Sequence, residues 1–113
     1  YAHAVLTTAA TRWLHTSGVV PVAPDGSTPD TVAEQAGVVW HNILAKLRDA
    51  GMGPTDDVSV TTYVVADQAG ELAGVMAARD AALDGHRAAS TLVTVPALAR
   101  PDWKMEIAIV AAA

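Results

Sequence analysis

The chain has 113 residues, of which 51% are hydrophobic and 17% charged, with 7 lysines and arginines against 12 aspartates and glutamates. A net charge of -5 without any basic run argues against nucleic-acid binding, which depends on clustered cations. The absence of cysteine excludes disulfides and thiolate metal sites and favours a cytoplasmic location. No apolar run reaches the roughly 18 residues that would cross a membrane. The length fits one domain over residues 1–113, and the apolar excess favours self-association.

The N-terminal part contains two short runs of apolar, β-branched and aromatic residues. Residues 4–10 and 13–16 predict a β-hairpin with its turn at residues 11–12, and Gly18 ends the second strand. Residues 19–29 then carry three prolines and an Asp-Gly pair, which predict a surface loop.

An amphipathic helix is predicted next. Thr31 followed by Glu34 matches a capping box, and Asp30 is an alternative N-cap for the same helix. Gly51 ends the helical pattern. One face is apolar and carries Val32, Ala36, Val39, Ile43 and Leu47. The opposite face is polar and carries Glu34, His41, Lys46, Arg48 and Asp49. The pattern predicts a helix that packs on a sheet.

A strand and a second helix follow. Residues 58–65 predict a strand, and Asp67 is the expected N-cap of a helix that ends at Gly85. Gly70 and Gly74 weaken this helix by about 1 kcal/mol each relative to alanine, so packing has to stabilise it. The side of the helix expected to pack carries Leu72, Val75, Met76, Arg79 and Leu83.

The stretch from residue 86 to 110 predicts two strands that are buried within a sheet, separated by Pro96 and Pro101. Glu106 lies in the middle of the second strand, where a buried carboxylate is costly without a partner or a purpose. Such a group can hold and deprotonate a water molecule. Alternatively, it points to solvent or pairs with a lysine or arginine across the sheet. The element order predicts an α+β sheet with both helices on one face and an apolar face left for another subunit.

Other chemistry has little support in the sequence. Glycine-rich phosphate loops are absent, so no cofactor is predicted. The four histidines lie in different elements, and a metal site is not predicted. Arg87 could bind a substrate carboxylate through two hydrogen bonds, or it could simply be an exposed arginine.

Five segments, taken together, resemble the RidA (YjgF-like) family, which is also labelled endoribonuclease L-PSP. They occur in the expected order and spacing over essentially the whole chain. They are Tyr-Ala-His-Ala-Val at 1–5, Thr-Ser-Gly at 16–18, Asp-Asp-Val-Ser-Val-Thr-Thr-Tyr-Val at 56–64, Ala-Ser-Thr-Leu-Val at 89–93 and Met-Glu-Ile at 105–107.

The resemblance implies a chorismate-mutase-like fold and a homotrimer with small-molecule clefts between neighbouring subunits. It also implies hydrolysis of reactive enamines or imines to a 2-keto acid and ammonia. In that scheme an arginine clamps the substrate carboxylate and a glutamate positions water. Glu106 aligns with the glutamate, and Tyr1, Gly18 and Thr91 match positions that line the family's pocket.

Two departures from the family pattern affect the expected activity. Ala89 occupies the place of the family arginine, for which Arg87 is a possible substitute, and Met76 stands where asparagine is common. The first hypothesis is therefore an enamine or imine deaminase that uses Glu106. The second is a trimeric small-molecule binder that has lost deamination. Ribonuclease activity, a third possibility, finds no support in the acidic composition.

Overall fold

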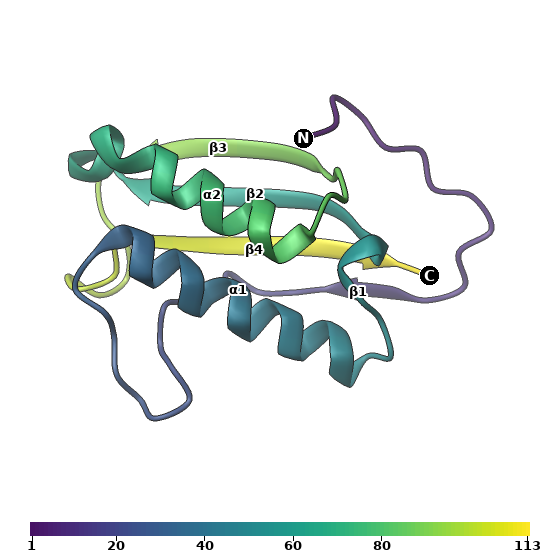
Figure 1. The fold of residues 1–113 in the computed structure, drawn as a ribbon, viewed down its shortest axis with the longest axis horizontal. Helices are drawn as coiled ribbons and strands as arrows, with labels where there is room; N and C mark the ends of the chain where they lie inside the picture. Colours follow the sequence, from purple (N-terminus) through teal and green to yellow (C-terminus); the bar gives the residue numbers. More distant parts are fainter.

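The computed structural model describes residues 1–113 and shows one mixed sheet with two helices on one of its faces (Figure 1). The strands are β1 (Trp13–His15), β2 (Asp57–Val65), β3 (Ala89–Val95) and β4 (Met105–Ala112). The helices are α1 (Val32–Asp49) and α2 (Leu72–Leu83), with the 3-10 helices η1 (Pro54–Asp56) and η2 (Ala66–Glu71). The predicted α+β architecture, with both helices on one face, is confirmed.

The strand order is β1-β4-β2-β3, with β4 antiparallel to both of its neighbours and β3 parallel to β2. The prediction of two interior strands is correct for β4 and wrong for β3. β3 lies at the edge of the sheet, where its outer side meets only an isolated bridge from Ala2 to Ala89. A run of β-branched residues indicates a strand but not how many neighbours it has.

Side-chain alternation divides the sheet into a helical face and an open face. On β4 the residues buried against the helices are Met105, Ile107, Ile109 and Ala111. The open face carries Glu106, Ala108 and Val110 of β4, Thr61 and Tyr63 of β2, and Ala89, Thr91 and Val93 of β3.

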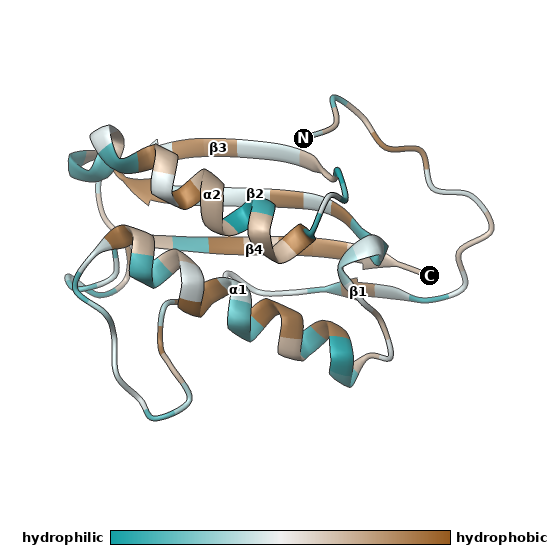
Figure 2. Cartoon of the chain, in the orientation of Figure 1, coloured by the Kyte–Doolittle hydropathy of each residue, from teal (hydrophilic) through white to brown (hydrophobic).

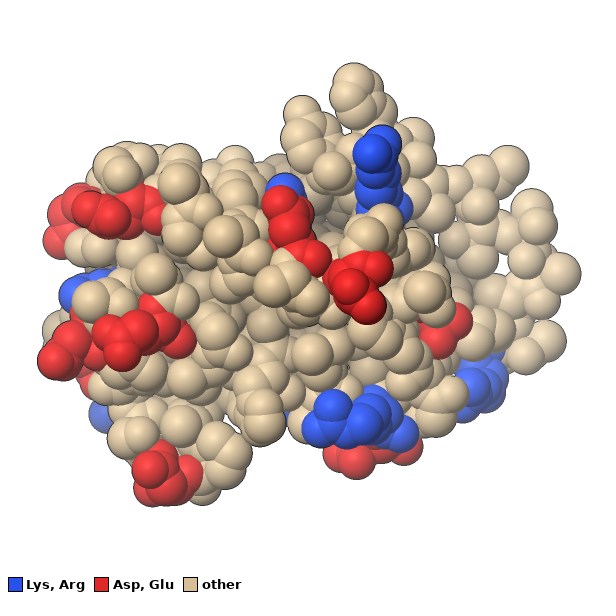
Figure 3. All heavy atoms as spheres, in the orientation of Figure 1, with Lys and Arg blue, Asp and Glu red and all other residues tan.

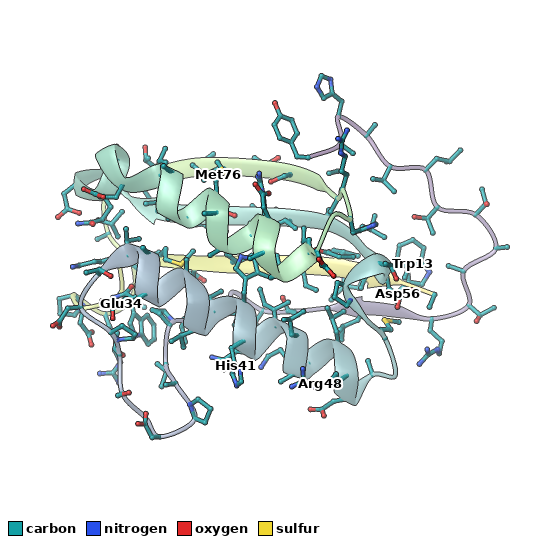
Figure 4. The ribbon with its side chains drawn as sticks, viewed as in Figure 1. Trp13, Glu34, His41, Arg48, Asp56 and Met76 are labelled. Atoms are coloured by element: carbon teal, nitrogen blue, oxygen red, sulfur yellow. The ribbon has the colours of Figure 1, made fainter.

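Helix α1 forms as predicted. The Thr31 hydroxyl accepts the Glu34 N–H at 3.2 Å and donates to the Glu34 carboxylate at 2.7 Å, so Thr31 rather than Asp30 is the N-cap. All five residues of the predicted apolar face are buried. The outer face is polar, as the striping of α1 in Figure 2 and the labelled side chains in Figure 4 show.

Gln35, on the same helix, fixes the start of β4. Its side-chain amide donates to the carbonyl oxygens of Pro29 and Asp102 and accepts the N–H of Lys104 at 2.8 Å. Gln35 is fully buried, so these bonds satisfy an amide that would otherwise be costly there. They tie the segment before β4 to α1, and this positions the strand that carries Glu106.

The predicted N-terminal hairpin is wrong. Residues 4–10 form no strand, and β1 pairs with β4 instead. The segment passes around the end of the sheet from the β3 edge to the β1 edge, and both Thr11 and Arg12 donate their N–H groups to the carbonyl of Ala113 (Figure 1). A short apolar run forms a strand only where a neighbouring strand offers hydrogen bonds. Here the C-terminal strand β4 pairs with residues 13–15, in place of the predicted pairing with residues 4–10.

The predicted start of the second helix is also wrong. Asp67 lies in η2, and α2 begins at Leu72 after Glu71, whose side chain makes no capping bond. The 3-10 helix takes up the residues that the pattern assigned to a first α-helical turn. Gly74 does more than weaken α2, because a Cβ at this position would lie 2.9 Å from the Cβ of Ala33 on the neighbouring helix. It allows the two helices to approach closely.

Asp57, at the start of β2, is a buried carboxylic acid that no sequence pattern singled out. It is 2% exposed, and neither of its carboxyl oxygens has a hydrogen-bond partner. Burial raises the pKa of the Asp57 carboxyl from its ordinary value of 3.8 to about 7, because the core disfavours the charged form.

This shift predicts a pH-dependent loss of stability. Between pH 4 and 7 the folded protein holds a proton on Asp57 that the unfolded chain has released, so stability falls as pH rises and stays lower above pH 7. An Asp57→Asn variant should be more stable than wild type at pH 8 by about 1–3 kcal/mol and nearly equal to it at pH 4. Urea unfolding from pH 4 to 8 measures this difference. A difference that does not change with pH would contradict it.

Candidate functional site on the open face of the sheet

Glu106 projects from β4 onto the open face, opposite Tyr63 of β2. Residues 16–19 run beside this part of β4. Val19 and Ile107 exchange two backbone hydrogen bonds of 2.7 and 3.1 Å, and the Thr16 hydroxyl accepts the N–H of Ile109 at 3.0 Å. These bonds hold Gly18 against the side chain of Glu106.

The Glu106 carboxylate occupies the space that a side chain at position 18 would fill. An ideal Cβ on Gly18 would lie 1.7 Å from Oε2 of Glu106 and 2.9 Å from its Cδ. Glycine is therefore required here for close approach, although its backbone conformation is ordinary. The resemblance alone pointed to Gly18, and the packing gives the physical reason.

Glu106 is half-buried and has no hydrogen-bond or ion-pair partner within the chain. The one salt bridge in the structure joins Arg79 and Asp80 on α2. The alternative in which Glu106 pairs with a lysine or arginine across the sheet is therefore wrong. The carboxylate is left free to accept a hydrogen bond from water or a ligand.

A second group of predicted site residues lies at the β3 edge. Ala89 and Thr91 face the open side of β3, and Arg87 is exposed in the loop before it. Tyr1 is held nearby because Ala2 donates its N–H to the carbonyl of Ala88 at 2.9 Å. Tyr1 and Arg87 line one cavity of about 480 Å³.

The two groups are far apart in one chain. Glu106 pairs with Tyr63 and Ala89 with Ser59, so four residues of β2 separate their levels. The Cα atoms of Glu106 and Ala89 are therefore about 13 Å apart along the strands and about 10 Å apart across them, or roughly 16 Å apart overall. One chain therefore unites Glu106 with Gly18, and Tyr1 with Arg87, but it does not bring the two pairs together.

Met76 belongs to neither group. It lies half-buried on α2, on the helical side of the sheet (Figure 4). Glu106 and Thr91 face the open side. The sequence pattern places Arg79 with the packing side of α2, and its side chain is indeed mostly buried, 6.0 Å from the centre of the Tyr1 ring. Its signal in the sequence is a cation within an otherwise apolar stripe.

The structure contains no cluster of three or more histidine, aspartate and glutamate side chains arranged to hold a metal ion. None of its helices is long and apolar enough to span a membrane. What the fold presents is an unpaired carboxylate on an open sheet face, next to a glycine that the carboxylate requires. The sheet with two helices on one face defines a class of small α+β proteins with a chorismate-mutase-like fold.

Comparison with known families identifies the group within this class. The model of the family described as Endoribonuclease L-PSP matches residues 1–113, and the chain belongs to this family. The comparison with curated proteins gives no match.

The solved structures that resemble this chain include several Rid and YjgF proteins. YyfB, a protein of the Rid family from Yersinia pestis, is 33% identical, with 99% of this chain and 86% of that chain covered and a TM-score of 0.90. The YjgF protein of Escherichia coli is 31% identical over 99% and 87% of the two chains, with a TM-score of 0.81. TdcF of E. coli, solved with bound serine, is 26% identical over 100% and 87%, with a TM-score of 0.81.

The contact between Gly18 and Glu106 predicts a selective effect of Gly18→Ala. The methyl group would expel the end of a flexible side chain rather than backbone atoms, so the free energy of unfolding should change by less than about 1 kcal/mol. The Glu106 carboxylate should move to a different rotamer. A crystal structure and thermal unfolding of the variant check both points. An unfolded variant, or an unmoved carboxylate, would contradict this description of the site.

Proposed function

We propose that this protein hydrolyses a reactive enamine or imine derived from an amino acid, releasing ammonia and a 2-keto acid in a cleft between two copies of the chain. The observation that carries the proposal is the unpaired Glu106 carboxylate seated on Gly18. A free, half-buried carboxylate beside an apolar sheet face is suited to orient and deprotonate water.

The reaction can be written for 2-aminoacrylate through its imine tautomer. Glu106 accepts a proton from water as the water oxygen bonds to the imine carbon, and the imine nitrogen takes up a proton. Glu106 then returns its proton to the amino nitrogen of the carbinolamine, which leaves as ammonia when the carbon–nitrogen bond breaks. The hydroxyl releases its proton to solvent, which replaces the one that the imine nitrogen took up, and forms the ketone. The products are pyruvate and ammonia, and Glu106 returns to its starting state.

The distance between the two groups of site residues supports a cleft between copies. Roughly 16 Å is too far for one small substrate to contact both Glu106 and Ala89 at the start of β3. The open face also leaves large apolar side chains uncovered, with Trp13 52% and Val93 40% exposed. Covering this face with further copies in a closed ring, as the family resemblance implies for a homotrimer, would bury these side chains.

The size of the ligand has support from a related protein. TdcF was solved with serine bound, and at 26% identity it covers the whole of this chain. An amino-acid-sized ligand is consistent with the proposed substrate class.

Loss of activity in Glu106→Gln tests the proposal. 2-Aminoacrylate or its imine would be generated in place by an amino-acid-consuming enzyme, with ammonia and pyruvate measured over time. Wild-type protein should accelerate release over buffer, and Glu106→Gln should abolish the acceleration because an amide cannot accept the water proton. Glu71→Gln is a matched control, since Glu71 is exposed and makes no side-chain capping bond. Wild-type protein that matches buffer would overturn the proposal for this substrate.

The alternative is a small-molecule binder without deaminase activity, and Ala89 at the place of the family arginine favours it. In that case Ala89→Arg should create pyruvate binding or ammonia release where wild type has none, since an arginine–carboxylate pair adds charge-assisted hydrogen bonds. Thr94→Arg places the same side chain on the other side of β3 as a control. An Ala89→Arg protein that assembles like wild type and remains inert would count against a simply vacated site.

A further inference from the structure

Arg79 is a mostly buried cation whose hydrogen bonds are incompletely used. Its side chain is 12% exposed, and its guanidinium lies 6.0 Å from the centre of the Tyr1 ring. Nη1 donates to the Ser90 hydroxyl at a long 3.4 Å, and Nε donates to Oδ1 of Asp80 at 3.1 Å. Nη2 forms an ion pair with the same oxygen at 3.0 Å. A guanidinium has five N–H donors, so part of its capacity is unused.

The partner of Arg79 is weakly held. Asp80 is the adjacent residue on α2, its side chain is 68% exposed, and it offers only Oδ1 to the guanidinium. An ion pair whose acidic member is exposed contributes little in water. A ligand carboxylate that presents both oxygens to Arg79 would form the stronger, two-bond arrangement and displace Asp80 toward solvent.

The surroundings of Arg79 form a cationic depression next to β3. Arg79 lines a narrow cavity of about 10 Å³ whose other lining residues are Tyr1, Asp80, His86 and Ser90 and the apolar Val60, Leu83 and Ala88. It shares Tyr1, Asp80 and His86 with the open cavity of about 480 Å³ that Arg87 lines. Within this depression the two arginines outnumber the one aspartate, in a chain whose net charge is -5. Figure 3 shows basic and acidic side chains side by side in the upper middle of this face of the molecule.

His86 adds a polar atom to the same depression. Its Nε2 lies 2.6 Å from the carbonyl oxygen of Asp57, and only a protonated nitrogen can bond to a carbonyl, so Nε2 is the donor. The other ring nitrogen, Nδ1, makes no hydrogen bond within the chain and is available to a ligand.

We propose that Arg79, assisted by Arg87, is the carboxylate anchor of this protein, supplied from α2 instead of from position 89. This inference rests on the proposed function, because it assigns the group that holds the substrate's carboxylate. The ligand class is a small 2-keto or 2-imino acid, whose carboxylate binds Arg79 beneath Tyr1. Glu106 from a neighbouring copy would supply the water chemistry.

Binding of pyruvate, measured by calorimetry, tests the anchor without any turnover. Arg79→Met should weaken pyruvate binding at least tenfold, and Arg79→Lys should weaken it too because lysine cannot form the two-bond pair. Asp80→Asn should strengthen binding by about two- to fivefold, since it removes the competing carboxylate. Pyruvamide, which lacks the negative charge, should bind equally weakly to all of these proteins.

Arg100→Met is the matched control, because Arg100 lies over the Trp103 ring at 5.8 Å in a comparable arrangement elsewhere in the molecule. It should leave pyruvate binding unchanged. Unchanged binding in Arg79→Met, weaker binding in Asp80→Asn, or binding of phosphate without binding of pyruvate would overturn the anchor.

Binding and turnover separate the two proposals. If pyruvate binding depends on Arg79 but no variant or wild-type protein releases ammonia, the anchor stands and the proposed hydrolysis fails. If wild-type protein releases ammonia and Arg79→Met leaves the KM unchanged, the hydrolysis stands and the anchor fails. Thermal unfolding of Arg79→Met and Arg79→Lys confirms that each is folded before either comparison is made.

Discussion

The close contact between Glu106 and Gly18 is the constraint on which the candidate site depends. It requires β4 in the interior of the sheet, residues 16–19 bonded along it, and a residue without a side chain at position 18. Gln35 supports the same arrangement from the helical layer by fixing the residues that precede β4. The fold thereby holds an unpaired carboxylate at a defined place on a largely apolar face.

The sequence predicts those parts of the molecule whose signals are local. α1 is one example, because its cap and its apolar stripe lie within the same residues, and the strand character of residues 58–65 is another. The predicted cap at Asp67 is wrong because residues 66–71 form a 3-10 helix before α2 begins. The predicted N-terminal hairpin is wrong because its outcome depends on a distant partner. The C-terminal strand took the hydrogen bonds of residues 11–15, and no local pattern contains that information.

The candidate site shows the same division. Glu106 stood out as a charge within an apolar strand, and the family resemblance added Gly18 and Tyr1. Neither showed that Glu106 and the β3 edge lie on opposite sides of β2, because register is a property of the folded sheet. Arg79 entered only through its position beside Tyr1. With alanine at position 89, the proposed anchor on α2 would supply the cation that the resemblance leads one to expect at that position.

The central claim is that the site is completed between copies, and subunit complementation tests it most directly. Glu106→Gln and Arg79→Met proteins, each inactive alone, would be unfolded, mixed in equal amounts and refolded together. If each site takes its glutamate from one copy and its arginine from the next, random mixing should restore about a quarter of wild-type activity. A mixture of Glu106→Gln with the Glu106→Gln/Arg79→Met double variant should stay inactive. If the first mixture also stays inactive although mixed oligomers have formed, the shared site is contradicted.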